Sequence, residues 1–421
     1  MSDPAPLDRT RRREAATTLL LARIVYAFNW YNIGGLSVPL AATIGVTTFE
    51  FGVVLGAFLI GAGLFQVPAG LAALRWGNRA TSLFALVLMG GFSLASAFSP
   101  NWIVLAAFRF GAGAGAAFFF APALGLIASY YPSGSRGPII GLYNSGFSIG
   151  SGIGLFGGAL IGASYGWPLA LAVGGIGLLV MAAIGPFTLP RGAGRVALPS
   201  FRRLWNDAAA PIFRSRSIWA LALAVSGLWA AYYVAAQYFI AFASAVHPGW
   251  SVAVAAAVPV VMIILEVPGG PIGGWIGERA VSMRLVLLVW GVVSAVGIFA
   301  IPLLGLPGLL ALFGFLGFAD GVVFAVLYLI PSYLPESRGE TLALGLAFVN
   351  SIQIFLGSLL AIVFGYIAGM WGYEAAWWFA GVIALAPLPL LAWVSGRGGD
   401  ATYVRARARG PRGVRAPSRP M

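Results

Sequence analysis

Twelve apolar stretches, each close to the roughly 20 residues that a membrane-crossing helix requires, constrain this chain more than any other feature. Short segments rich in Gly, Pro or Asn separate them, as at Ser99-Pro100-Asn101 and His247-Pro248-Gly249. Their boundaries are about 17–38, 50–73, 81–99, 102–128, 138–162, 167–187, 217–245, 250–275, 284–303, 307–333, 342–368 and 374–395. The sequence therefore predicts an all-α membrane protein with 12 transmembrane helices.

The composition agrees with a membrane location and argues against several functional classes. Apolar residues make up 60% of the chain and charged residues 9%, whereas soluble domains carry about 25% charged residues. The chain has no cysteine, and its single histidine, His247, lies in a predicted loop. It has no lysine, so a phosphate-binding loop ending in Gly-Lys-Ser/Thr cannot form. We therefore expect no enzyme activity, no metal site and no cofactor.

The distribution of arginine predicts the orientation of the chain in the membrane. All 25 basic residues are arginine, and those outside the spans lie at both termini, in the central loop and on the connections of one side. The six connections on the other side contain no arginine. Positive charge is enriched on the cytoplasmic side of membrane proteins. The pattern predicts cytoplasmic N- and C-termini in a multi-pass protein of the cytoplasmic (inner) cell membrane.

This orientation divides the chain into five segments. They are a cytoplasmic N-terminal tail at 1–16, an N-terminal six-helix half at 17–187, a cytoplasmic central loop at 188–216, a C-terminal six-helix half at 217–395 and an Arg-rich, disordered cytoplasmic tail at 396–421. The last tail contains seven arginines and a single aromatic residue, Tyr403. Contact of the tail and the Arg-rich loops with anionic lipid headgroups is therefore expected, and nucleic-acid binding is not.

An internal repeat relates the two halves. The segment from Val67 to Ala80 recurs 200 residues later, from Val267 to Ala280, at the corresponding end of the eighth span. A second pair, 131–137 and 334–339, follows the fourth and the tenth spans. Both pairs relate the first six spans to the last six in the same orientation. Two parallel six-helix repeats joined by a long loop are typical of one transporter architecture.

Several motifs in these repeats resemble those of the major facilitator superfamily (MFS). The loop motif G-x-x-x-D-R/K-x-G-R-R/K is matched in part by Gly70, Arg75, Gly77 and Arg79, and in the second half by Gly270, Gly277 and Arg279. Its acidic position holds Leu74 and Gly274, which departs from the family. Arg109-x3-Gly113 resembles the motif of the fourth helix, and glycines from Gly146 to Gly158 resemble the fifth. The resemblance implies the MFS fold and a secondary transporter with a central cavity.

Four ionisable residues lie inside the predicted spans: Arg23, Arg109, Glu266 and Asp320. A charge at the bilayer centre costs at least about 2.5–3.5 kcal/mol, so each of these residues is expected to have a structural or functional role. Arg23 is close enough to the cytoplasmic end to reach the lipid headgroups. Arg109 either ties neighbouring helices together or contacts an anionic substrate. Asp320, at the midpoint of the tenth span, is the expected proton carrier, and Glu266 is either a second proton-coupling group or a structural hydrogen-bonding one.

Amide and aromatic side chains gather near the midpoints of the spans that line the cavity in the family. Amides in lipid are unfavourable unless they meet polar surroundings, so we expect these residues to face the cavity. With Arg109, the expected substrate-binding residues are Asn29, Asn32, Asn144, Trp229, Tyr232, Tyr233, Gln237, Asn350 and Gln353.

The sequence thus predicts a monomeric secondary active transporter of the symporter type that works by alternating access. Its expected substrate is a small organic anion or polar metabolite, with a proton as co-substrate. Two alternatives stay open. The first is proton-driven efflux of a drug or metabolite, which an aromatic cavity and Asp320 would also serve. The second is a membrane sensor that has kept the fold and lost transport.

Overall fold

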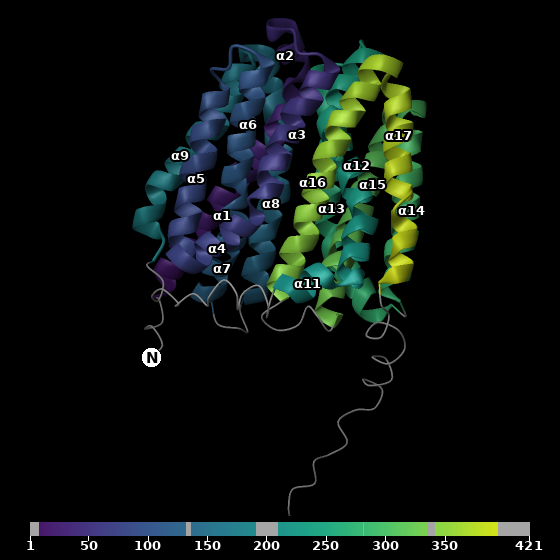
Figure 1. Ribbon diagram of the computed structural model, residues 1–421. Coiled ribbons are helices and arrows are strands. Elements are labelled where there is room, and N and C mark those ends of the chain that lie inside the picture. The colour runs from purple at the N-terminus through teal and green to yellow at the C-terminus, as the bar shows by residue number, and fades with distance from the viewer. Residues whose placement is uncertain (1–7, 132–135, 191–208, 281, 335–341, 395–421) are drawn as a thin grey trace, which may run out of the picture.

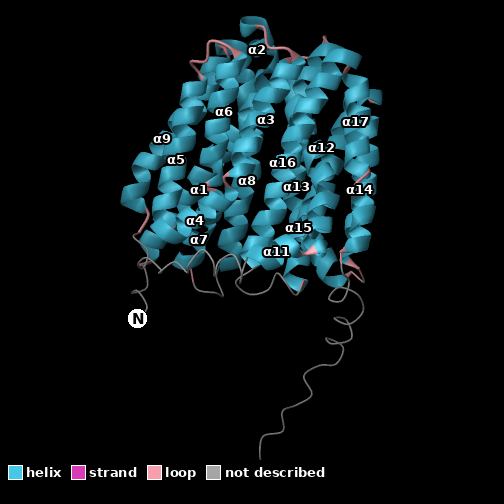
Figure 2. Ribbon diagram, in the orientation of Figure 1, coloured by secondary structure: helices cyan, strands magenta, loops and turns pink. Residues whose placement is uncertain are grey.

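The computed structural model describes residues 8–131, 136–190, 209–280, 282–334 and 342–394. Residues 1–7 of the predicted N-terminal tail, most of the predicted central loop and the whole predicted C-terminal tail lie outside these residues. The described residues form helices, turns and loops, and no strand occurs among them (Figure 2). This confirms the predicted all-α class.

The N-terminal part of the described chain forms nine α-helices and one 3-10 helix. In order they are α1 (Arg9–Tyr31), η1 (Asn32–Leu36), α2 (Ser37–Ile44), α3 (Thr48–Leu64), α4 (Gln66–Trp76), α5 (Asn78–Ser96), α6 (Trp102–Ala117), α7 (Phe120–Tyr130), α8 (Arg136–Tyr165) and α9 (Trp167–Thr188). The C-terminal part forms α11 (Ala210–Arg214), α12 (Arg216–Val246), α13 (Val252–Arg279), α14 (Met283–Ala300), η4 (Ile301–Leu303), α15 (Leu306–Leu329), η5 (Ile330–Tyr333), α16 (Leu342–Trp371), α17 (Tyr373–Leu385) and η7 (Leu388–Trp393).

Each of the twelve predicted spans is helical, but not every one is a single long apolar helix. The described residues contain 10 helices long and apolar enough to cross a membrane, or 11 if α3 and α4, bent by 44°, form one span. The first predicted span is carried by α1, η1 and α2 and is not among them. Polar residues such as Arg23 and Asn29 reduce the hydropathy of α1. The number twelve therefore remains a prediction.

Local sequence signals account for several helix boundaries. The Thr47 side chain accepts a hydrogen bond from the Glu50 backbone N–H, and the Glu50 carboxylate accepts one from the Thr47 N–H, which starts α3. Asn101, Ser215, Ser251 and Ser282 cap the first turns of α6, α12, α13 and α14 in a similar way. Gly77, with φ of 84°, separates α4 from α5 in a backbone conformation that other residues rarely adopt.

The helices form two bundles side by side, with α1 to α9 on the left and α12 to α17 on the right of Figure 1. In the first bundle α1 packs against α8, α3 against α6 and α5 against α9; in the second, α12 packs against α16, α13 against α15 and α14 against α17. The bundles are joined mainly by α3 with α16 and by α8 with α13, and α12 also contacts η1 and α2. We call the end of the molecule that carries α2 the α2 end, and the opposite end the α7 end (Figure 1).

Glycine allows the same close approach in both bundles. A Cβ atom on Gly113 of α6 would overlap the Phe58 carbonyl oxygen of α3, and one on Gly317 of α15 would overlap the Met262 carbonyl oxygen of α13. In lipid the hydrophobic effect does not drive helices together. Small residues promote their association instead, because they allow the backbones to come into van der Waals contact. The corresponding crossings agree with the predicted repeat.

The two bundles are tightly joined from the middle of the molecule to the α2 end. A Cβ atom on Gly52 of α3 would meet the Ala361 carbonyl oxygen of α16, and one on Gly365 of α16 would meet the Thr48 carbonyl oxygen. Tyr238 Oη of α12 donates a hydrogen bond to the Ala361 carbonyl oxygen (2.9 Å) and lies 3.4 Å from that of Thr48. The passage between the bundles is therefore closed at the α2 end.

Candidate functional site

Aromatic side chains line the junction of the two bundles near its middle. Tyr31 of α1 contacts Phe147 of α8 (ring centroids 6.0 Å apart) and Tyr233 of α12 (6.0 Å). Tyr233 in turn stacks on Trp229 at 5.5 Å, and Trp30 meets Phe147 at 6.1 Å. Together with Tyr26, which lies 6.3 Å from Phe147, these rings are called the aromatic wall below: Tyr26, Trp30, Tyr31, Phe147, Trp229 and Tyr233. The wall crosses from one bundle to the other.

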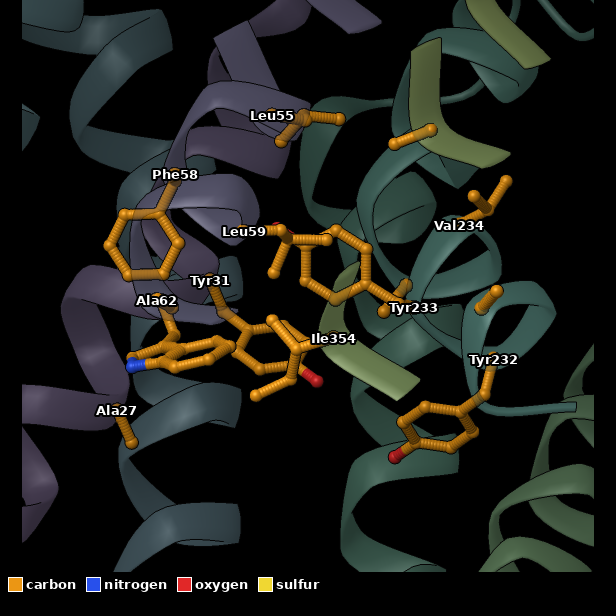
Figure 3. Packing of buried hydrophobic residues seen from close by; sticks show 14 of the residues in the cluster. Ala27, Tyr31, Leu55, Phe58, Leu59, Ala62, Tyr232, Tyr233, Val234 and Ile354 are labelled. Atoms are coloured by element: carbon orange, nitrogen blue, oxygen red, sulfur yellow. The ribbon is translucent and has the colours of Figure 1, made fainter. Parts of the chain in front are cut away.

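Glu266 of α13 and Asp320 of α15 form a carboxyl pair on the C-terminal side of the junction. Tyr232 Oη donates a hydrogen bond to Glu266 Oε2 at 2.7 Å. The two carboxyl groups interact electrostatically with each other and with the Tyr31 hydroxyl of the opposite bundle. Both carboxylic residues are half-buried. In Figure 3 the Tyr31 hydroxyl points toward the C-terminal bundle and the Tyr232 hydroxyl points back toward the N-terminal bundle.

Asp320 also borders a small cavity inside the C-terminal bundle. Tyr232, Ser294 and Asp320 contribute the polar part of its lining, and the cavity has a volume of about 20 Å³. That is room for about one water molecule. The buried Ser294 hydroxyl has no hydrogen-bond partner among the described residues. The cavity can therefore hold one polar ligand of water size beside the carboxyl pair.

Arg109 is sealed inside the N-terminal bundle. It is 0% exposed, its guanidinium lies 4.3 Å from the Phe58 ring, and its Nη2 donates to the Asn29 carbonyl oxygen at 3.1 Å. Its Nε and Nη1 have no partner among the described residues. These contacts tie α6 to α1. This is the structural one of the two roles that the sequence left open for Arg109. Contact with a substrate remains a prediction.

Arg23 is placed differently from the sequence expectation. Its guanidinium carbon lies 4.5 Å from the centroids of the Phe120 and Phe147 rings, 4.9 Å from that of Tyr26 and 5.3 Å from that of Tyr143. The residue is only 7% exposed. The expected extension to the lipid headgroups is therefore wrong in this structure, because rings from α7 and α8 enclose the side chain.

Asn29 and Asn32 face the inside of the N-terminal bundle. Asn29 Nδ2 donates to the carbonyl oxygens of Val25 (2.8 Å) and Gly174 (3.0 Å), and Asn32 Nδ2 donates to that of Ala170 (3.4 Å). Both amides are fully buried. They join α1 and η1 to α9, so this geometry does not place them at the junction where a substrate would lie.

Replacing Asn29 or Asn32 by Ala is expected to reduce stability without weakening substrate binding. Each substitution removes an interhelical hydrogen bond worth about 0.6–1.7 kcal/mol in membrane proteins. The measurement is the melting temperature of purified protein beside the KM of transport. Asn144→Ala is the matched control, since Asn144 is exposed, and its melting temperature should not change. A KM that rises about tenfold at an unchanged melting temperature would instead place these amides in the site.

The remaining predicted amides and aromatics lie at or near the junction, with one exception. Gln237 Nε2 of α12 donates to the Trp30 carbonyl oxygen of α1 at 3.0 Å and so links the bundles. Gln353 of α16 is 2% exposed, and its Oε1 has no partner among the described residues. Asn350 Oδ1 accepts a hydrogen bond from Tyr328 Oη at 3.0 Å. Asn144 is the exception, because it is exposed on α8.

Some residues of the predicted loop motifs make contacts within their own bundle, and others are exposed. Arg79 Nε donates to the Leu189 carbonyl oxygen and Nη2 to that of Pro186, both at 2.7 Å, which fixes α5 to the end of α9. The Arg279 guanidinium lies 4.7 Å from the Trp275 ring on its own helix. Arg75 is exposed. Gly70 and Gly270 have open space around them, whereas Gly277 lies against Val326 and Leu329 of α15.

Sequence reasoning missed the rings around Arg23. Phe120, Tyr143 and Phe147 belong to α7 and α8, more than ninety positions from Arg23 along the chain. One signal was available, because Tyr143 and Phe147 are four residues apart, as are Tyr26 and Trp30, and residues at this spacing share a helix face. That signal does not say which helix the face meets.

Comparison with known proteins identifies the family. The 4-hydroxybenzoate transporter PcaK of Pseudomonas aeruginosa is 32% identical over 161 residues, which cover 38% of this chain and 36% of that protein. The gallate transporter of Pseudomonas putida is 29% identical over 42% of this chain and 40% of its own length. The matches thus span well under half the length of these curated relatives.

A solved structure is similar over nearly the whole chain. It is a bacterial homologue of the human lysosomal transporter Spinster, in an inward-facing and occupied conformation. The two share a TM-score of 0.76 at 18% identity, over 94% of this chain and 100% of the other, so they share the fold. The family described as Major Facilitator Superfamily matches residues 19–358. The chain therefore belongs to the Major Facilitator Superfamily, a family of transporters rather than enzymes.

Proposed function

We propose that this protein is a proton-coupled secondary transporter of small aromatic carboxylates. One observation carries the proposal: the aromatic wall runs through the junction of the bundles, from the buried cation Arg23 to the carboxyl pair Glu266 and Asp320. A flat ring stacks on such a wall, and its carboxylate needs a cation. Aromatic pairs contribute about 0.5–1.5 kcal/mol beyond simple burial.

Two further features support a polar aromatic substrate. Gln353 Oε1 and Gln237 Oε1 are buried acceptors without a partner among the described residues, so a ring hydroxyl can donate to them. Two relatives are named for 4-hydroxybenzoate and gallate, both hydroxylated aromatic carboxylates. These features narrow the predicted substrate from a small organic anion to a small aromatic carboxylate.

Proton coupling is assigned to Asp320 of the carboxyl pair, with Glu266 as its neighbour, held by the hydrogen bond from Tyr232. A carboxyl group in a membrane protein interior is unfavourable as an anion, so a proton binds or leaves as water reaches the site from one side or the other. The structure is closed at the α2 end, which the arginine pattern assigns to the outside. Alternating access then exposes Glu266 and Asp320 first to one compartment and then to the other, together with the substrate.

Purified protein in liposomes should accumulate radiolabelled 4-hydroxybenzoate when the outside is made acidic. One proton carried with each anion supports about tenfold accumulation for a gradient of one pH unit. Gallate should compete for uptake. Cyclohexanecarboxylate, which keeps the charge and loses the aromatic ring, should compete about two- to tenfold more weakly, because the stacking contribution is lost.

Protein-free liposomes control for passive entry of the neutral acid. Equal competition by cyclohexanecarboxylate would contradict the assignment of the aromatic wall to substrate binding. Efflux is the second candidate, since the same rings and carboxyl groups suit an antiporter. Release of a preloaded compound into an acidic exterior, with no uptake, would select it. Binding of 4-hydroxybenzoate without flux in either direction would identify a sensor.

A further inference from the structure

Arg23 has a surrounding that is unusual for a buried cation. Four rings from three helices enclose its guanidinium, with ring centroids 4.5–5.3 Å from the central carbon. The side chain is more than nine-tenths buried, at 7% exposure. Cation–π contacts of this kind are strongest when the cation is desolvated, so the rings stabilise the charge inside the protein. They do not neutralise it.

The hydrogen-bond donors of Arg23 are only partly used. Ring faces interact with the positive charge, whereas the guanidinium N–H groups lie in the plane of the group and require acceptors. The buried Nε of Arg23 has no acceptor among the described residues. The neighbouring Tyr143 hydroxyl, also buried, lacks a partner there as well. The enclosure therefore contains a buried N–H donor and a buried hydroxyl group to which a ligand can form hydrogen bonds.

A helix break lies beside the same guanidinium. The fourth predicted span is interrupted between α6, which ends at Ala117, and α7, which begins at Phe120. The Phe118 and Phe119 N–H groups bond back to Gly115 and Ala116 in a turn. The start of α7 contributes the positive end of a helix dipole, and Pro122 in its first turn has no N–H group. Phe120, its first residue, is also one of the rings around Arg23.

We propose that Arg23 and the start of α7 form the subsite that binds the carboxylate of the substrate. This inference rests on the proposed function and specifies its charged contact. Tyr26 and Phe147 belong both to the Arg23 enclosure and to the aromatic wall. A ligand with its carboxylate at Arg23 therefore lays its ring along Phe147 toward Tyr31. Arg109, one of the substrate-binding residues expected from the sequence, then acts within the N-terminal bundle.

The test compares two ligands that differ in charge. Binding of 4-hydroxybenzoate and of the neutral 4-hydroxybenzamide is measured by calorimetry on purified full-length protein in lipid nanodiscs. Arg23→Gln should raise the Kd of the carboxylate about 30-fold or more, as for removal of one partner of a buried charge pair. The Kd of the amide should stay within about twofold, because its ring contacts are unchanged.

Arg23→Lys is the second variant, and it decides the matter if Arg23→Gln does not fold. It keeps the charge but loses the planar fork, so the Kd of the carboxylate should rise about two- to tenfold, the value of one hydrogen bond, with no change for the amide. Equal loss for both ligands, or no loss for the carboxylate, overturns the subsite while leaving the proposed substrate class intact. Failure of the unsubstituted protein to bind either ligand overturns both.

Discussion

Replacing Asp320 by Asn is expected to abolish proton-driven accumulation of substrate while leaving substrate exchange in place. Asn has nearly the shape of Asp but cannot take up and release a proton. If Asp320 carries the coupled proton, the variant still binds substrate and changes conformation, but the pH gradient no longer drives net uptake. Accumulation in liposomes with an imposed gradient should fall about tenfold, to the level of equilibration. Counterflow of labelled for unlabelled 4-hydroxybenzoate should persist.

Glu266→Gln is the matched control. Tyr232 Oη donates to Glu266 Oε2, and the carbonyl oxygen of a glutamine can accept the same hydrogen bond. The expected accumulation is therefore within about threefold of the unsubstituted protein, less than the effect of one fully lost hydrogen bond. Accumulation that survives in Asp320→Asn would remove Asp320 from the coupling. Equal loss in both variants would assign the proton to the carboxyl pair as a unit.

The helical architecture could be predicted because lipid leaves the backbone few alternatives. Every N–H and C=O group in the hydrocarbon layer must be bonded within its own segment, so apolar stretches of this length become helices. All twelve predicted stretches are helical in the described residues. Hydropathy does not report breaks inside a stretch, and so α3 with α4, and α6 with α7, were each predicted as one helix.

The orientation of polar side chains was much harder to predict. Asn29, Asn32 and Gln237 are all buried amides near the middle of cavity-lining spans, and the sequence treats them alike. Gln237 links the two bundles, whereas the other two bond to α9 within one bundle. The difference depends on which neighbour each helix face meets. That is a long-range packing outcome, as is the enclosure of Arg23 by rings from α7 and α8.

Closure of the α2 end depends on glycine, and this leads to the second large expected effect. Gly365 of α16 lies against α3 and α12, where an added Cβ atom would meet the Thr48 carbonyl oxygen and the Tyr238 hydroxyl. Gly365→Ala should therefore disfavour the closed form by about 1–3 kcal/mol, a typical overpacking cost. This corresponds to a shift of about 5- to 150-fold toward conformations open at the α2 end. Transport should fall accordingly, since each cycle passes through the closed form.

Cysteine cross-linking can measure this shift directly, because the chain contains no cysteine of its own. Phe49 of α3 and Tyr366 of α16 meet at the α2 end with ring centroids 6.1 Å apart, so the pair Phe49→Cys and Tyr366→Cys should be joined by a short bifunctional thiol reagent. Adding Gly365→Ala should slow this reaction about fivefold or more. Gly369→Ala, one turn further along α16, is the matched control, since a Cβ atom there meets no neighbour within 4 Å. Cross-linking that proceeds equally fast in both variants would mean that the close approach at Gly365 does not limit closure.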